Sequence, residues 1–241
     1  MTDDELLAAY KAGEKDFSKA NLRGAVFLEE NLGGANFSDA DLSSADFSQS
    51  YLVDCNFSGA NLSRANLEDA HLSRAIFSGA NLSGTKFSRA DLSAAELQEL
   101  NLGKAILNNC SLVEANFSGS NLGKASLLRA DLNGANLAGA NLTKALMSGA
   151  QLIDANLTEA DLSYATLVNI NLSGANCRDA VFTNADLTGA DLSYADLMDA
   201  DLSYTNLKNA DLTGSNLKNV DLTGAILEGT IGYTGNKTYK K

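Results

Sequence analysis

The chain has 241 residues, 30 acidic and 18 basic side chains, and a net charge of −12. So large an acidic excess argues against direct nucleic-acid binding and against attraction to anionic membranes. No apolar run is long enough to span a bilayer, and the first residues, Met1–Glu5, are acidic where a secretory signal would be basic. We therefore expect a cytoplasmic protein with neither a nucleic-acid nor a membrane partner.

The first 14 residues predict a short N-terminal capping helix. Thr2 and Glu5 have the spacing of a capping box, in which each side chain bonds the other residue's backbone N–H group. Leu6, Leu7 and Tyr10 then form an apolar stripe, and Gly13 offers a stop. We expect a helix over residues 3–12 that covers the open end of the domain behind it.

Residues 15–229 repeat a five-residue unit without insertion or deletion. Every fifth residue from Phe17 to Leu227, here called the centre of its unit, is Leu in 32 of 43 units and Phe in nine. The residue two before the centre is Ala in 31 units, and the one between them is mostly Asn or Asp. A period of five fits neither a helix nor an ordinary strand. It predicts a single-domain β-solenoid that turns a corner in every unit.

The corner itself has a sequence signal. The residue two after the centre is Gly in 14 units and Asn in five. Both residue types tolerate the positive φ that a type II turn needs at its third residue. Each unit therefore predicts one short extended face followed by one turn.

Ala185–Tyr194 reads Ala-Asp-Leu-Thr-Gly-Ala-Asp-Leu-Ser-Tyr, two near-consensus copies of the motif A-(N/D)-L-x-x. On this motif, residues 15–229 resemble the pentapeptide-repeat family. The resemblance implies an all-β fold: a right-handed quadrilateral β-helix with four units, or twenty residues, per coil. The repeat would then form nearly eleven coils, about 50 Å long at a strand spacing of ~4.8 Å.

Twenty residues per coil would place eight of the nine phenylalanines on two opposing walls. Phe17, Phe37, Phe57, Phe77 and Phe117 share one wall, and Phe27, Phe47 and Phe87 share the other. We interpret this as core packing that leaves no room for a ligand. Residues 230–241 leave the repeat as a C-terminal tail or cap, where Ile231 and Tyr233 are candidates to cover the last coil. We expect a monomer or an end-to-end homodimer.

No motif indicates catalysis. The single histidine, His71, occupies a slot otherwise held mostly by Asn or Asp, which favours a polar ladder residue over a catalytic base. Cys55, Cys110 and Cys177 fall in slots that the repeat assigns to the interior, and none forms a C-x-x-C pair. We expect no catalytic, cofactor-binding or metal-binding residue.

One outward column carries the candidate partner-binding residues. Spacing by multiples of twenty places cations first and tyrosines after them: Arg64, Lys104, Lys124, Lys144, Tyr164 and Tyr204. Stacked like charges should repel, so we expect nearby acids such as Glu99 and Glu159 to relieve them. Cations followed by tyrosines suit a protein interface, whereas the alternative is an ordinary polar surface.

A second column is acidic: Asp39, Glu99, Glu159, Asp179 and Asp199. Some pentapeptide-repeat proteins mimic DNA and bind DNA gyrase, so the resemblance makes an acidic face a candidate for that role. The plainer interpretation is a solvated face, and acids in the slot before the centre have a local role in bonding turn N–H groups. Several gyrase-protecting members also carry loops that this chain lacks.

The sequence thus favours a non-enzymatic, rigid scaffold for a protein partner that it does not name. It is most like the loop-free cyanobacterial members of the family. The alternative is a DNA mimic that binds and protects or inhibits a type II topoisomerase such as DNA gyrase.

Overall fold

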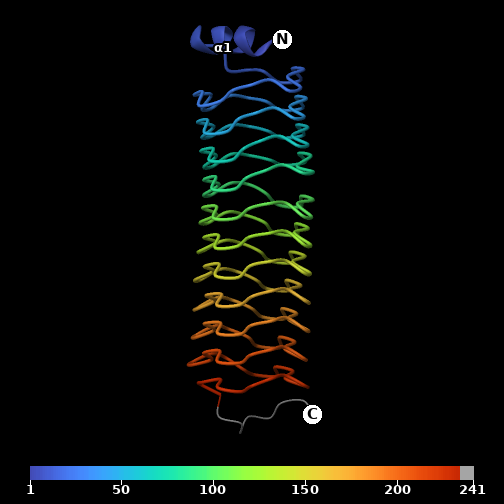
Figure 1. Cartoon of the computed structure of the whole chain (residues 1–241), viewed down its shortest axis with the longest axis vertical. Coiled ribbons are helices and arrows are strands. Elements are labelled where there is room, and N and C mark those ends of the chain that lie inside the picture. Colours follow the sequence, from blue (N-terminus) through green and yellow to red (C-terminus); the bar gives the residue numbers. More distant parts are fainter. Residues whose placement is uncertain (234–241) are drawn as a thin grey trace.

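The structure, a computed structural model, describes residues 1–233 as one straight rod (Figure 1). Helix α1, Asp3–Lys11, lies across the N-terminal end of the rod and is the only helix in this part of the chain. Behind it, the described backbone forms isolated parallel β-bridges in place of continuous strands. The predicted β-solenoid with one capping helix is confirmed.

The capping box at α1 is present as expected. The Glu5 N–H donates to the Thr2 hydroxyl at 3.2 Å, and the Thr2 N–H donates to the Glu5 carboxylate at 2.9 Å. The helix ends at Lys11, one residue before the expected end. Leu6 is fully buried against the first coil, and the Tyr10 hydroxyl donates to the Gly33 carbonyl at 2.8 Å. These contacts anchor the cap to the stack.

The bridges join residues that are twenty apart, as in Asn116 with Asn136 and Asn136 with Asn156. Four columns of bridges run along the rod and define four walls. We number the walls by their centres: wall 1 from Phe17 to Leu217, wall 2 from Leu22 to Leu222, wall 3 from Phe27 to Leu227, and wall 4 from Leu32 to Leu212. Each coil therefore stacks on the next in register, and a side chain's wall can be read from its number.

The turns are more uniform than the sequence indicates. All 43 residues that lie two after a centre have positive φ, although only 14 of them are glycine. A left-handed conformation costs a residue with a Cβ roughly 1–2 kcal/mol. Stacking offsets this strain, because the same residue donates its N–H to the next coil, as Arg64 does to Ser83 at 2.9 Å. Tertiary pairing therefore sets the turn, and glycine only makes it easier.

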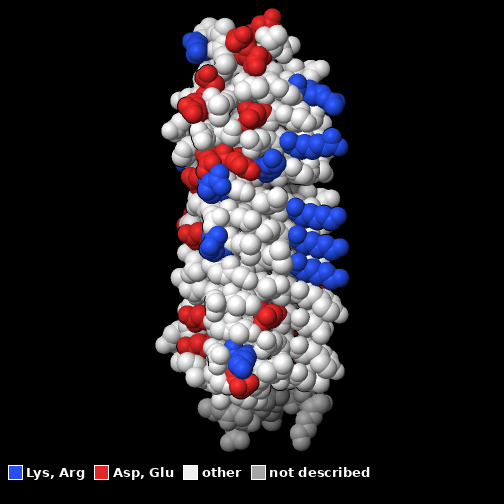
Figure 2. Space-filling view, in the orientation of Figure 1, with Lys and Arg blue, Asp and Glu red and all other residues white. Residues whose placement is uncertain are grey.

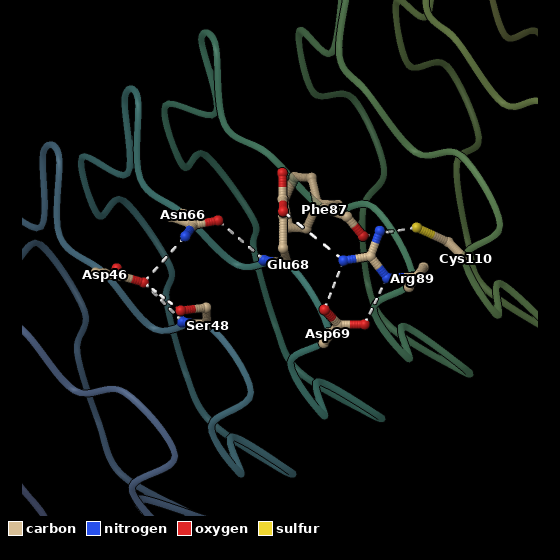
Figure 3. A network of polar contacts seen from close by, with 8 residues as sticks. All are labelled: Asp46, Ser48, Asn66, Glu68, Asp69, Phe87, Arg89 and Cys110. Carbon is tan, nitrogen blue, oxygen red and sulfur yellow. Dashed lines mark hydrogen bonds and ion pairs between the residues drawn. The ribbon is translucent and has the colours of Figure 1, made fainter.

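The interior is closed, as predicted. Phe37 stacks on Phe57 and Phe57 on Phe77 at centroid distances of 5.4 and 5.2 Å, and Phe47 on wall 3 meets Phe37 edge-on at 6.0 Å. The three cysteines are buried, and burial raises the pKa of the Cys110 thiol to about 12. Its Sγ donates to the Phe87 carbonyl at 2.9 Å (Figure 3). These thiols are core groups.

At the C-terminal end, Ile231 extends the stack through a bridge to Asp211 and is 56% exposed. Tyr233 is partly buried against the core. The lysines near the C-terminus lie beyond the described residues.

One seam interrupts the stack and is centred on wall 2. It reaches the neighbouring walls, where within residues 1–233 the bonds from Gly79 N–H to Gln98 and from Ile106 N–H to Thr85 are also missing. Elsewhere a wall-2 centre donates its N–H to the coil below, but no such bond joins Leu82 to Asn101 or Gly84 to Gly103 within residues 1–233, and the bridge between Asn81 and Asn101 is absent there. The green coils are correspondingly farther apart along one edge (Figure 1).

Leu100 explains the seam. It occupies a slot that holds Ala in most units, and its N–H bonds the Ser120 hydroxyl at 3.0 Å in place of its own turn carbonyl. The same hydroxyl donates to the Leu97 carbonyl at 2.6 Å. Gln98, in the same turn, has a buried Oε1 without a hydrogen-bond partner. The larger Leu100 side chain has displaced the turn, and the Ser120 hydroxyl now joins the Leu100 N–H group to the Leu97 carbonyl.

Candidate protein-binding wall

Two slots of each unit decide what the surface presents. The residue before the centre is tied down locally, because its side-chain oxygen accepts the N–H two residues later, as Asp161 does from Ser163 at 2.9 Å. The residue two after the centre projects from the turn and is exposed, as at Lys124 and Tyr164. The second slot therefore carries the side chains that a partner can reach.

On wall 2 this slot forms the expected column of cations and tyrosines. Lys104 and Lys124 lie on consecutive coils, and the N–H of Lys104 donates to the Gly123 carbonyl at 3.0 Å. Lys144 follows, and its Nζ lies 5.6 Å from the centroid of the Tyr164 ring, a cation–π contact. Basic side chains line one edge of the rod in Figure 2. Arg64 belongs to the same column, on the other side of the seam.

Two arginines in the same slot of walls 3 and 4 have a different environment. Arg74 Nε lies 2.7 Å from Asp54 Oδ1, and Arg89 pairs with both oxygens of Asp69 at 2.7 Å (Figure 3). In both cases an arginine lies one coil after an aspartate in the same column. The hydrogen bonds from Arg89 hold the pKa of the Asp69 carboxyl below its usual value, and Arg74 has the same effect on Asp54.

The wall-2 cations have no such partner. Among the described residues, every ion pair uses Arg74, Arg89, Arg178 or Lys208, all on the other walls. Glu99 and Glu159, the acids expected to relieve the stacked lysines, form no ion pair with them within residues 1–233. The reason lies in the column: two after the centre, wall 2 carries no acid at any coil. Four cations remain unpaired there in an acidic protein.

The tyrosines form two separate sites. Tyr204, on wall 2, lies over Gly224, where a Cβ would sit 2.7 Å from the ring. Tyr194 covers Gly214 in the same way on wall 4. Each glycine thus lets a ring lie flat along the rod. Tyr164 and Tyr204 are 57% and 61% exposed, so both remain available for contact.

The acidic column is on wall 1 and is discontinuous. Glycines separate Asp39 from Glu99 and Glu99 from Glu159, and only Glu159, Asp179 and Asp199 lie on consecutive coils. Asp199 accepts a hydrogen bond from the Asn219 amide at 2.9 Å. Arg178 lies on the same wall and pairs with Asp196 at 2.6 Å. The acidic face is therefore short and mixed with basic charge.

His71 lies in the ladder, as expected. Its ring is exposed and stacks on Tyr51 at a centroid distance of 4.6 Å. Its backbone N–H donates to the Ser50 carbonyl at 2.9 Å, whereas its ring nitrogens bond no serine or carboxylate within residues 1–233. None of the helices in this range is long and apolar enough to cross a membrane.

Sequence reasoning missed a groove on wall 2. Glycine replaces the usual Ser or Thr at Gly103 and Gly123, which opens a hollow of about 390 Å³ beside Lys104 and Lys124. Its other side is an amide ladder, in which Asn121 Nδ2 donates to Asn101 Oδ1 at 3.1 Å. The sequence shows the two glycines as consecutive exceptions in the slot one after the centre. It does not show that together they form a groove.

Comparison with known proteins agrees with the repeat. The family model described as pentapeptide repeats matches eight copies between residues 16 and 231. The chain belongs to the pentapeptide-repeat family. The family's fold is a right-handed β-helix, which assigns the handedness of this rod.

Several solved pentapeptide-repeat structures are similar to the chain. HetL, involved in heterocyst differentiation regulation in Nostoc sp. strain PCC 7120, is 34% identical over 95% of this chain and 94% of its own, with a TM-score of 0.41. QnrB1, a plasmid-mediated fluoroquinolone resistance protein, is 25% identical over 85% of each chain, with a TM-score of 0.40. Rfr23 from Cyanothece 51142 is 34% identical over 44% of this chain and 63% of its own, with a TM-score of 0.27. No curated protein matches.

Proposed function

We propose that the protein is a non-enzymatic scaffold of nearly eleven coils that binds a protein partner through wall 2. One observation carries this proposal: none of the four cations in the column from Arg64 to Lys144 forms an ion pair within residues 1–233, whereas cations on each of the other walls do, namely Arg74, Arg89, Arg178 and Lys208. Tyr164 and Tyr204 extend the same wall with exposed rings suited to interface anchoring. We place the protein in the cytoplasm, as a monomer or an end-to-end homodimer.

The test is affinity capture from a lysate of the source organism, read by mass spectrometry. The wall-2 variant replaces Lys104, Lys124 and Lys144 by Asn, a residue that tolerates positive φ and already occupies this slot at Asn184. The matched variant makes the same change at Arg74, Arg89 and Arg129 on walls 3 and 4. A partner that the wall-2 variant loses and the matched variant keeps supports the proposal. A partner retained by both variants contradicts the choice of wall.

DNA mimicry toward a type II topoisomerase is the second candidate, because Glu159, Asp179 and Asp199 place three acids on consecutive coils. It predicts that the purified protein changes DNA gyrase supercoiling. The effect should weaken with salt and disappear in Asp179→Lys with Asp199→Lys. A supercoiling assay that shows no effect of the parent protein eliminates this candidate and leaves the scaffold untouched.

A further inference from the structure

Wall 2 has a long stretch that carries only positive charge. Its units between Asn61 and Lys144 contain four cations and no Asp or Glu, although the whole chain has 30 acidic residues. The slot before the centre, which elsewhere holds many aspartates, is Asn in all five of these units. Any ligand along this stretch meets ammonium, guanidinium and amide groups. Its own chemistry must therefore be anionic.

The asparagine amides and lysines of the groove are exposed, and their hydrogen bonding decides which groups a ligand can reach. Asn101, Asn121 and Asn141 are exposed, whereas Asn116, Asn136 and Asn156 in the same slot of wall 1 are half-buried. In the groove the amide oxygens are already used: Oδ1 of Asn101 accepts from Gly103 N–H at 3.2 Å, and Oδ1 of Asn121 from Gly123 N–H at 3.0 Å. Asn121 uses one of its two amide N–H groups on Asn101 Oδ1, so its second amide N–H and the lysine ammonium groups remain for a ligand, and the groove offers mainly donors.

The seam adds backbone groups to the same wall. The Gly84 N–H group and the carbonyls of Asn101 and Gly103 lack the coil-to-coil bonds that their counterparts make, and all three residues are at least partly exposed. Leu82 lacks the same bond but is only 1% exposed, so its N–H group is out of reach of a ligand. The three exposed groups lie between Arg64 and Lys104, the two cations that flank the seam. An extended peptide has both N–H and C=O groups to satisfy such a mixture. A phosphate backbone has acceptors only. The seam therefore favours a peptide over a nucleic acid or polyphosphate.

The length of the stretch sets the size of the ligand. From Arg64 to Lys144 is four coils, ~19 Å at a spacing of ~4.8 Å. An extended peptide rises ~3.3 Å per residue, so about six residues span this distance and about three of their side chains face the wall. Three carboxylates would therefore face the four unpaired cations. A longer polyanion would meet the carboxylates that wall 2 carries beyond this stretch, at Asp41 and Asp161.

We propose that wall 2 between Asn61 and Lys144 binds an extended acidic segment of a partner protein, with alternate carboxylates on the cation column. This rests on the proposed function and specifies the chemistry of the partner. Tyr164, at the end of the stretch, is placed to contact the residue that follows the acidic run.

The probe is a fluorescein-labelled peptide of ten residues that alternates Glu and Ser, measured by fluorescence anisotropy. Its control alternates Gln and Ser. We expect the Glu peptide to bind, the Gln peptide to bind at least tenfold more weakly, and added salt to weaken binding. The Lys104→Asn, Lys124→Asn, Lys144→Asn variant should lose at least tenfold in affinity. The matched Arg74→Asn, Arg89→Asn, Arg129→Asn variant should stay within twofold.

A second variant tests the groove without changing the charge. Gly103→Thr with Gly123→Thr fills the floor with the residue type found at Thr143, and neither glycine has positive φ. We expect a loss of affinity with unchanged circular dichroism.

Three results overturn the inference: no binding of the Glu peptide, an equal loss in both charge variants, or tighter binding of single-stranded DNA or polyphosphate. Affinity capture then separates the two proposals. If the peptide fails but a captured partner still depends on Lys104, Lys124 and Lys144, the scaffold stands and only the partner's chemistry is wrong. If no captured protein depends on them, both fail.

Discussion

Wall 2 and the other three walls are built from the same repeat, yet they differ in two respects. Wall 2 holds the centre of a seam where most of the missing coil-to-coil bonds lie, and the cations of its column lack the carboxylates that pair with Arg74 and Arg89 elsewhere. The difference teaches that the consensus slots fix the shape of the rod, whereas the few exceptions to them give each wall its own chemistry.

A second large residue in the Ala slot leaves the stack of coils intact. Ile170 also replaces Ala in its slot, but the coils around it keep their bonds: Asn171 N–H donates to Ala150 at 3.0 Å and Asp191 N–H to Ile170 at 2.9 Å. The centre seven residues after Ile170 is Cys177, whereas the centre seven residues after Leu100 is Leu107. We attribute the closed stack at Ile170 to this smaller centre. The core then accepts a large residue when another residue of the coil gives up volume.

The largest effect should come from breaking a regular wall. Leu132, on wall 4, is fully buried. Leu132→Asp places an unpaired carboxylate among apolar side chains, which we expect to destabilise the rod by about 4 kcal/mol or more. Urea unfolding followed by circular dichroism measures the loss. Parent-like stability would mean that the centre does not face the interior.

Cys177→Leu should create a second seam. It restores the larger centre beside Ile170, and overpacking of this kind costs about 1–3 kcal/mol. We also expect faster hydrogen exchange at Asn171 and Asp191, whose N–H groups now pair across coils. If stability and exchange both stay at the parent level, compensation of volume does not explain the closed stack.

Leu100→Ala should close the existing seam. Truncation of a buried leucine to alanine usually costs about 2–5 kcal/mol, which is what we expect for Leu102→Ala as the control. For Leu100→Ala the cost should be smaller, below about 1.5 kcal/mol, because recovered backbone bonds offset the lost burial. Hydrogen exchange at Leu82 and Gly84 should slow. Unchanged exchange there would show that another feature holds the seam open.

Removal of a single surface cation should have the smallest effect on stability, and the sign of that effect should differ between walls. Arg89→Asn removes the partner of Asp69 and should lower stability slightly, whereas Lys124→Asn relieves repulsion and should not. Both differences should fade near 1 M salt, where the screening length is ~3 Å. The pairing of Asp69 lowers its pKa, so its contribution is present at neutral pH and is lost as the pH falls below the ordinary value of 3.8. A destabilised Lys124→Asn would mean that its ammonium group is paired.

Much of this architecture could be predicted from the sequence. The five-residue period gave the inward centres and the phenylalanine stacks, and Thr2 with Glu5 gave the helix start. The uniform turn was harder to predict, because 24 of its 43 positive-φ residues are neither Gly nor Asn. The seam could not be predicted from Leu100 alone, since Ile170 in the same slot causes none. The unpaired state of the lysines depends on which acids reach them across coils, and only the structure shows that.

Photocrosslinking tests the central claim, that wall 2 is the face that meets a partner. Tyr164 on wall 2 and Tyr194 on wall 4 are both exposed aromatic residues with positive φ, so each can be replaced by p-benzoylphenylalanine with little change in shape. After irradiation in cells, we expect a specific adduct from position 164 and none from position 194. An adduct from position 194 alone, or equal adducts from both, would contradict the account.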